Sequence, residues 1–364
     1  MAQSISPQQR ALNFGAYTRQ HIQTLGSQKG GSNSHIEFEV PKARLLQGIN
    51  LLCEVELATS TASNWKATTL NEKMELYNIL RRVSIDYNNG FSPVVASGKD
   101  IAVANMLRMN PKIVHPSGVE GASLCTITAP RVTTDTEDAF TAESATAMKY
   151  YFMLELPLTL NERDPSGLVL AQNGQTLINF SCDIADTVKL STPATITVSN
   201  VNIIPVLGTF SIPTAPEAFP DLSVLKILDS RTETFTGGGS NVVKLPVGMI
   251  YRKLILKFEK TDGTPMTADE ITSNIELVFN TADIPYSVHP KALRLRTTSQ
   301  IGGKLPEGYY AFDFTYQGMP NYGGSRDYVD TERLTTFELR FTTADSGKVT
   351  IISEKISRLI SSNN

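Results

Sequence analysis

The feature that most constrains this chain is an internal repeat of strand-like segments. Val40-Pro41 precedes a run of alternating apolar residues that begins at Leu45, and Leu245-Pro246 precedes a similar run that begins at Ile250 after the same interval. Alternation with a period of two is typical of a strand with one buried face, and proline is tolerated at a strand entrance. The repeat predicts two similar β domains in tandem.

A second pair of motifs recurs at nearly the same interval. Thr69-Leu70-Asn71-Glu72 and Thr267-Ala268-Asp269-Glu270 both match a capping box, in which the threonine and glutamate side chains satisfy backbone N–H groups at the start of a helix. We expect a short helix at each position. A shorter loop in the second domain accounts for the small difference in spacing.

Length and composition fit two domains of one class. The chain has 364 residues, more than one core usually supports, and half of it, about 180 residues, suits a sandwich or barrel. Its net charge of −3 gives no global electrostatic case for nucleic acid. We expect neither a signal peptide nor a membrane span. The cysteines, Cys53, Cys125 and Cys182, lack metal-ligand spacing, and we expect buried thiols in a protein folded in a reducing compartment.

The apolar patterns predict an all-β fold class with two tandem jelly rolls of seven or eight strands each, short helices and an N-terminal arm. Long loops between the strands favour this topology over a tight meander. The strands expected in the first domain are 35–40, 47–58, 80–87, 124–129, 148–160, 177–184 and 195–206. Those expected in the second are 241–245, 252–260, 275–280, 293–298, 309–316, 335–342 and 348–352.

The same patterns divide the chain into five parts. We expect an N-terminal arm at 1–34, a first jelly roll at 35–208, a Pro-rich linker at 209–220, a second jelly roll at 221–352 and a C-terminal helical tail at 353–364. Proline stiffens a linker, and helical spacing of Ile356, Leu359 and Ile360 favours the tail.

The arm has an unusual charge pattern. The first 36 residues contain no Asp or Glu, and they include the basic residues Arg10, Arg19, His21 and Lys29. Pro7 fits the start of a short helix, and the Gly- and Ser-rich residues 26–34 fit a flexible segment. We expect these four residues to face a partner, with a disordered start that binds nothing as the alternative.

The candidate catalytic and metal-binding motifs in the sequence lack the residue spacing that such sites need. The four histidines, His21, His35, His115 and His289, are far apart and lack zinc-ligand spacing. Acidic residues at 135, 137, 138 and 143 lie in a Thr-rich stretch, where calcium or solvent is the alternative, and we favour a solvated loop. Thr236-Gly237-Gly238-Gly239-Ser240 is a turn rather than a phosphate cradle, because no lysine-hydroxyl pair follows it. We therefore expect that the protein is not an enzyme and binds no cofactor.

Paired arginines mark the start of one expected strand. Arg81-Arg82 precedes Val83-Ser84-Ile85, so one arginine should point to each face. An ion pair between subunits and an ordinary charge on an edge strand are both open, and we favour the edge charge.

Several segments resemble one known family. They are Met1-Ala2-Gln3 with Pro7-Gln8-Gln9-Arg10-Ala11-Leu12, the run from Asn78 to Tyr87, the run from Tyr150 to Leu158 with Leu168-Val169-Leu170-Ala171, and Leu305-Pro306-Glu307-Gly308-Tyr309-Tyr310. In order and length these segments resemble the major capsid protein of tectivirus-type bacteriophages, which are tailless and contain a membrane. The likeness spans most of the chain, although its motifs are patterns without signature residues.

The resemblance implies a double jelly roll of the lineage shared with the adenovirus hexon. Three copies would form one capsomer with six similar sides, so that a single gene product could tile a nearly hexagonal shell. The implied partners are the protein itself, as a homotrimer with lattice neighbours, together with penton and minor capsid or membrane proteins and an internal lipid membrane around double-stranded DNA. The N-terminal arm would face that membrane, and no specific nucleic-acid contact is implied. The implied location is the outer capsid of a virion, after synthesis in the host cytoplasm.

Two other classes of protein remain open at this point. A tandem β-sandwich that binds carbohydrate needs an exposed aromatic platform, and Trp65 is the only tryptophan. If the protein is a viral spike or fibre, its trimers should be elongated. If it is a capsomer protein, its trimers should be squat with a hexagonal outline.

Overall fold

The structure is a computed structural model, and it describes residues 7–58, 74–88, 90–108, 125–127, 147–160, 165–171, 177–189, 196–222, 224–315 and 328–358. The chain forms two compact units. The first comprises Met1–Asn105, Lys112–Lys226 and Arg358–Asn364, and the second comprises Met106–Pro111 and Ile227–Ser357.

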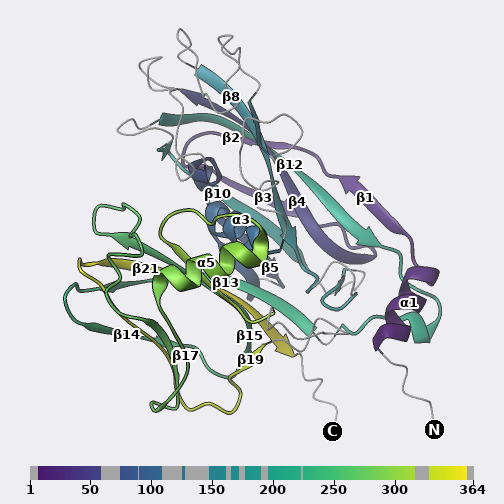
Figure 1. Ribbon diagram of the computed structural model, residues 1–364. Coiled ribbons are helices and arrows are strands. Elements are labelled where there is room, and N and C mark those ends of the chain that lie inside the picture. Colours follow the sequence, from purple (N-terminus) through teal and green to yellow (C-terminus); the bar gives the residue numbers. More distant parts are fainter. Residues whose placement is uncertain are drawn as a thin grey trace, which may run out of the picture. The chain divides into compact units, whose positions relative to one another are not determined.

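The first unit contains two antiparallel sheets (Figure 1). One sheet has the order β1 (Gln20–Thr24), β12 (Ile196–Phe210), β4 (Leu45–Ala58), β8 (Ala147–Pro157), β7 (Cys125–Ile127). The short strands β2 (Gln28–Gly30) and β11 (Thr187–Val188) also pair with β12, and β9 (Val169–Leu170) pairs with β4. The other sheet has the order β3 (His35–Glu39), β10 (Ile178–Ile184), β5 (Leu80–Tyr87), β6 (Phe91–Ala96). The helical elements are α1 (Pro7–Tyr17), η2 (Glu75–Ile79), α3 (Gly98–Met106) and η3 (Pro216–Ala218).

The second unit has the same plan. One sheet has the order β13 (Val224–Phe235), β21 (Gly347–Arg358), β15 (Ile250–Lys260), β18 (Tyr309–Asp313), and β19 (Val329–Asp330) pairs with β15. The other has the order β14 (Ser240–Leu245), β20 (Phe337–Thr342), β16 (Ile275–Phe279), β17 (Asp283–Val288). The helix α5 (Pro290–Ile301) follows β17 along the chain, as α3 follows β6.

The two units correspond strand for strand. In each, the first strand pairs with the last, the last with the third, and the third with the sixth, while the second, seventh, fourth and fifth form the other sheet. This is the jelly-roll order, with β1 and β2 sharing the first position of the first roll. The expected fold class, two tandem jelly rolls, is confirmed, and β4 and β15, from which the repeat was predicted, occupy the same position.

Each roll has its own core between its sheets. In the second roll, Phe258 on β15 meets Phe341 on β20 with a ring distance of 4.9 Å, and Tyr310 on β18 at 5.7 Å. In the first roll, Phe152 on β8 meets Tyr77 on η2 at 5.0 Å, and both side chains are fully buried. Cys53 and Cys182 are buried free thiols on opposite sheets, as expected, and burial raises the pKa of both thiols. The side chain of Cys125 lies outside the described residues.

An asparagine after the fourth strand repeats between the rolls. Asn88 follows β5 and Asn280 follows β16, both with a left-handed backbone (φ 53° and 49°). Asn88 Oδ1 accepts from Leu177 N at 2.8 Å, and Asn280 Oδ1 accepts from Thr335 N at 2.8 Å. Each asparagine thus ties the turn to the residues just before the seventh strand.

Replacing Asn280 should separate backbone from side-chain effects. Asn280→Ala is expected to destabilise the second roll by about 2 kcal/mol, because alanine disfavours the left-handed backbone and loses the side-chain hydrogen bond. Asn280→Gly should cost about 1 kcal/mol, because glycine keeps that backbone conformation. Urea denaturation measures both values. A glycine variant less stable than the alanine variant would contradict this assignment.

The helices that follow the fifth strands are capped at equivalent positions. Ser97 Oγ accepts from Asp100 N at 3.1 Å before α3, and His289 Nδ1 accepts from Lys291 N at 3.2 Å before α5. Pro290 occupies the first turn of α5 and Gly302 ends it with a φ of 69°. The expected strand at 293–298 is therefore wrong. The alternation of leucine and arginine suggested a strand, but the N-terminal proline and C-terminal glycine are helix signals.

Other differences concern the ends of the chain and the capping box. Residues 353–358, expected as the start of a helical tail, continue β21. The reason is that the backbone of β15 pairs with β21 as far as Ile250 and Ile356. The Glu270 carboxylate does accept from Thr267 N at 2.7 Å, but a turn follows instead of a helix. The Thr69 box lies outside the described residues. Arg81 and Arg82 are both exposed, and β5 pairs with β6 and β10, so it is not an edge strand of its sheet.

Burial of one tyrosine predicts alkaline destabilisation. Burial raises the pKa of Tyr310 to about 12, and its hydroxyl donates to Met266 O at 3.2 Å. The folded state therefore holds this proton more tightly than the unfolded state does, so the stabilising contribution is complete below pH 10 and is lost as the pH rises from 10 to about 12. The unchanged protein and the Tyr310→Phe variant should each be measured at pH 8 and across that range. We expect the variant to lose less of its pH 8 stability than the unchanged protein does. Parallel curves for the two proteins would refute this.

Candidate functional site

The four basic residues predicted to face a partner lie on three different segments. Arg10 is half-buried on α1, Arg19 is exposed just before β1, His21 is half-buried on β1, and Lys29 is exposed on β2. Of these segments, β1 and β2 belong to the sheet of the first roll. Residues 28–30, expected to be flexible, pair with Val201–Ile203 of β12. The reason is that β12 extends beyond β1 on this side, so its backbone groups at Val201–Ile203 are available to β2.

The helix α1 is fixed to the first roll by one aromatic side chain. Phe14 is buried with Leu45 and Leu168, and its ring meets Phe210 edge-on at 5.2 Å. Thr18 Oγ1 and Thr18 N both donate to Phe14 O, at 2.7 and 3.0 Å, and end the helix. This part of the N-terminal segment is therefore a docked element of the first roll.

Several apolar side chains near this helix point to solvent. Leu12 is 69% exposed, Tyr17 56% and Ile22 72%. Together with Arg10 and Arg19 these residues form what we call the N-terminal surface, which is basic and apolar. Its own residues include no carboxylate, and the exposed Glu217 lies on η3, which packs against α1. Exposed apolar groups of this kind mark contact sites when they cluster. The composition of this surface could be read from the sequence, but only the docking of Phe14 distinguishes the exposed apolar residues from the buried one.

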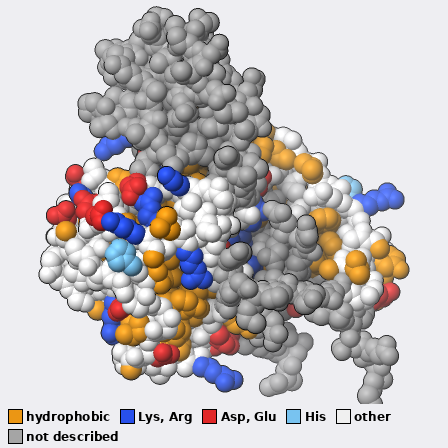
Figure 2. Space-filling model, in the orientation of Figure 1, with side chains coloured by type: hydrophobic (Ala, Val, Ile, Leu, Met, Phe, Trp, Pro, Cys, Tyr) orange, Lys and Arg blue, Asp and Glu red, His pale blue; other side chains and the backbone are white. Residues whose placement is uncertain are grey.

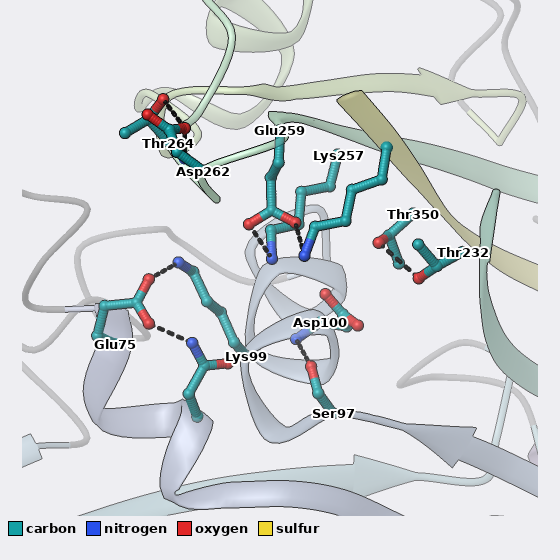
Figure 3. Close-up of polar contacts among 12 residues, drawn as sticks. Glu75, Ser97, Lys99, Asp100, Thr232, Lys257, Glu259, Asp262, Thr264 and Thr350 are labelled. Carbon is teal, nitrogen blue, oxygen red and sulfur yellow. Dashed lines mark hydrogen bonds and ion pairs between the residues drawn. The ribbon is translucent and has the colours of Figure 1, made fainter. Parts of the chain in front are cut away.

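Two polar clusters elsewhere have a structural role. Figure 3 shows the Glu75 carboxylate facing the Lys99 ammonium, and it also accepts from the Asn78 amide. In the second roll, the Glu259 carboxylate forms ion pairs with Lys257 Nζ at 2.9 Å and Lys348 Nζ at 3.4 Å (Figure 3). Both clusters neutralise a partly buried charge, and neither includes a nucleophile paired with a base.

The described residues bring no metal ligands together. No group of three or more His, Cys, Asp or Glu side chains with metal-binding geometry occurs among them. His35 Nδ1 pairs with Asp183 Oδ1 at 2.6 Å, and His289 caps α5, so each has a local partner. His115 and the acidic stretch at 135–143 lie outside the described residues. Residues 236–239 form the expected turn between β13 and β14, and Ser240 begins β14.

Two further observations bear on membranes and on the surface. Over the described part of the chain, no helix has the length and apolar character needed to cross a bilayer. Figure 2 shows apolar side chains at the described surface, set among charged ones.

The strand order defines a fold that can be compared with solved structures. Two jelly rolls in one chain, matched strand for strand, form the double jelly roll found among viral major capsid proteins. No protein-family model and no curated protein matches the sequence.

Solved structures give the particular likenesses. The major capsid protein of Sulfolobus turreted icosahedral virus matches with a TM-score of 0.66 and 13% identity, over 93% of this chain and 97% of that one. The major capsid protein P2 of bacteriophage PM2 matches with a TM-score of 0.55 and 11% identity, over 95% of this chain and 100% of that one. The Faustovirus major capsid protein matches with a TM-score of 0.58 and 10% identity, over 94% and 91%. At these identities the likeness establishes the fold.

Proposed function

We propose that this chain is a viral major capsid protein that forms homotrimeric capsomers with six similar sides. The observation that carries the proposal is the strand-for-strand match of the two rolls within one chain. A threefold assembly of such chains presents six jelly rolls, so it can occupy a nearly hexagonal lattice position with one gene product. The likeness over nearly the full length of capsid proteins such as that of bacteriophage PM2 supports this role.

The wider setting is part of the same proposal. We infer an icosahedral shell of the tectivirus type around an internal membrane and a double-stranded DNA genome, with penton and minor capsid or membrane proteins as further partners. The protein would be made in the host cytoplasm and would reside in the outer capsid of the virion. The role is structural rather than enzymatic, and the net charge of −3 favours no specific nucleic-acid contact.

The size of the purified protein tests the trimer. Analytical ultracentrifugation is expected to give a species of three times the 39.8 kDa chain mass, stable on dilution to nanomolar concentration. A monomer at all concentrations would contradict the proposal. An elongated trimer, with a frictional ratio far above that of a compact particle, would favour a spike or fibre instead.

We propose that the N-terminal surface contacts the internal membrane. Arg10 lies on α1, which also carries the exposed Leu12 and Tyr17, while Arg19 just before β1, His21 on β1 and Lys29 on β2 add positive charge. A basic residue near an anionic lipid surface contributes about 1 kcal/mol, so one chain binds weakly. A trimer has three arms and a shell has many trimers, so many such weak contacts together attach the shell firmly to the membrane.

Vesicle flotation tests the lipid contact. We expect the trimer to float with vesicles of phosphatidylglycerol and phosphatidylcholine but not with phosphatidylcholine alone. Arg10→Glu should reduce the bound fraction at least about tenfold, because a charge reversal changes each contact by roughly twice the contribution of one charge and three copies act together. Arg296→Glu, on the exposed side of α5, is the matched control and should bind like the unchanged protein. Equal flotation by the two variants would refute the lipid contact.

A further inference from the structure

The connection between the two rolls is packed against the first roll. It runs from the end of β12 at Phe210 to the start of β13 at Val224, and the structure describes residues 211–222 of it. These residues are counted with the first compact unit. Ala218 and Pro220 are buried, and Ala218 has no exposed surface. The connection is therefore held in place along part of its length and is not a free strand in solvent.

The helix α1 provides much of this packing. Phe14 is 6% exposed, and its ring meets Phe210, the last residue of β12. Ile212 and Leu222, from the two ends of the connection, pack against the buried cluster that contains Phe14. Near the middle of the connection, η3 packs against α1 (Figure 1). The helix and its cluster thus contact the connection at its beginning, its middle and its end.

Hydrogen bonds add to these apolar contacts. Arg19 follows α1 along the chain, and Ser211 is the first residue of the connection. Ser211 N donates to Arg19 O at 2.9 Å, and Arg19 N donates to Ser211 Oγ at 2.9 Å. The start of the connection is therefore bound to the residue that leaves the helix, so the position of α1 and the path of the connection depend on each other.

One face of α1 serves this contact and the other does not. Ala11, Phe14 and Thr18 recur at helical spacing and are buried or half-buried, whereas Leu12 and Tyr17 are exposed. An isolated helix of 11 residues is marginal in water, so α1 depends on its docked face. Removing the Phe14 ring should therefore release the helix and uncover the connection together.

We propose that α1 is a clamp on the connection between the two rolls. Docking of Phe14 holds residues 211–222 in one path, and the N-terminal helix thereby limits how freely the second roll moves relative to the first. A segment held by a small number of apolar contacts opens locally before the whole fold does. With α1 undocked, the connection becomes mobile while both rolls stay folded. The clamp belongs to the single chain, and only its use in holding six rolls at fixed angles rests on the proposed capsomer.

Cleavage by a glutamate-specific protease tests the clamp. Glu217 has an exposed side chain, but its backbone lies in η3, which packs against α1. Phe14→Ala is expected to raise the rate of cleavage after Glu217 at least about tenfold, because proteases cut locally opened chains. Mass spectrometry identifies the two products, residues 1–217 and 218–364. Tyr17→Ala, at an aromatic residue of the same helix that is 56% exposed, is the matched control and should be cleaved like the unchanged protein.

Hydrogen exchange shows whether the opening is local. In Phe14→Ala, the amides of Ser211, Ala218 and Phe219, which donate backbone hydrogen bonds, should exchange at least about tenfold faster. Amides at the centres of β4 and β12 should exchange as in the unchanged protein. Phe14→Leu keeps an apolar side chain at this position and should restore most of the protection.

Two results would overturn the inference. The first is unchanged cleavage and exchange of residues 211–222 in Phe14→Ala. The second is faster exchange throughout the first roll in that variant, because Phe14 would then support the whole roll and not the connection alone. A monomeric protein in solution would refute the proposed capsomer but would leave this test of the clamp unaffected, since each measurement is made within one chain.

Discussion

Phe258→Ala is expected to destabilise the second roll by about 4 kcal/mol, because a fully buried aromatic residue leaves a cavity that its surroundings cannot fill. The Phe258 ring meets Phe235 at 6.1 Å, Tyr310 at 5.7 Å and Phe341 at 4.9 Å, and so connects the two sheets of the roll. Losing it removes contacts from both sheets together. Guanidinium denaturation, followed by circular dichroism, measures the change.

The control for this prediction is a side chain of the same roll outside the core. Val242→Ala, at a residue 51% exposed, should change the stability by less than about 0.5 kcal/mol. A loss below about 1.5 kcal/mol for Phe258→Ala would mean that the sheets do not share this core. A destabilised second roll should also impair assembly, since half the sides of the proposed capsomer depend on it.

Glu75→Ala is expected to destabilise the first roll by about 3 kcal/mol. The Lys99 side chain is only 5% exposed, and the Glu75 carboxylate compensates its charge from η2. Removing Glu75 takes one partner away from a poorly solvated charge, which costs more than the pair itself contributes. The pair joins the segment before the fourth strand to the helix after the fifth, so its loss should also loosen α3.

A double substitution separates the charge from the packing. Glu75→Met combined with Lys99→Met removes both charges and keeps apolar volume, so it should recover most of the stability lost in Glu75→Ala. Urea denaturation of the Glu75→Met variant, the Lys99→Met variant and the double variant completes the double-mutant cycle. If the double variant is less stable than Glu75→Ala, then the site depends on shape and not on the charge of Lys99.

The tandem jelly rolls could be predicted from sequence because their longest strands have regular patterns. The alternating residues from Leu45 and from Ile250 mark β4 and β15, each paired on both sides within its sheet. Such strands carry the clearest period, since one face always meets the core. The matching Asn88 and Asn280, each followed at the same interval by Pro93 or Pro285, offered a second signal that only the structure made plain.

The strands missed from sequence are those without a regular buried face. On β1, four of five residues are exposed, so there is no alternation to detect, and β13 has a mixed pattern. The sequence also could not distinguish Phe14, which is buried, from Leu12 and Tyr17, which are exposed. Those differences depend on tertiary contacts with β4 and β12. The N-terminal residues could therefore be recognised as basic, but not as part of a sheet edge.

The most direct test of the central claim is an image of the purified oligomer by negative-stain electron microscopy. Two matched rolls in each of three copies predict a squat particle with threefold symmetry and a nearly hexagonal outline in top view. Class averages of single rolls in isolation, of twofold particles or of long thin trimers would contradict the account.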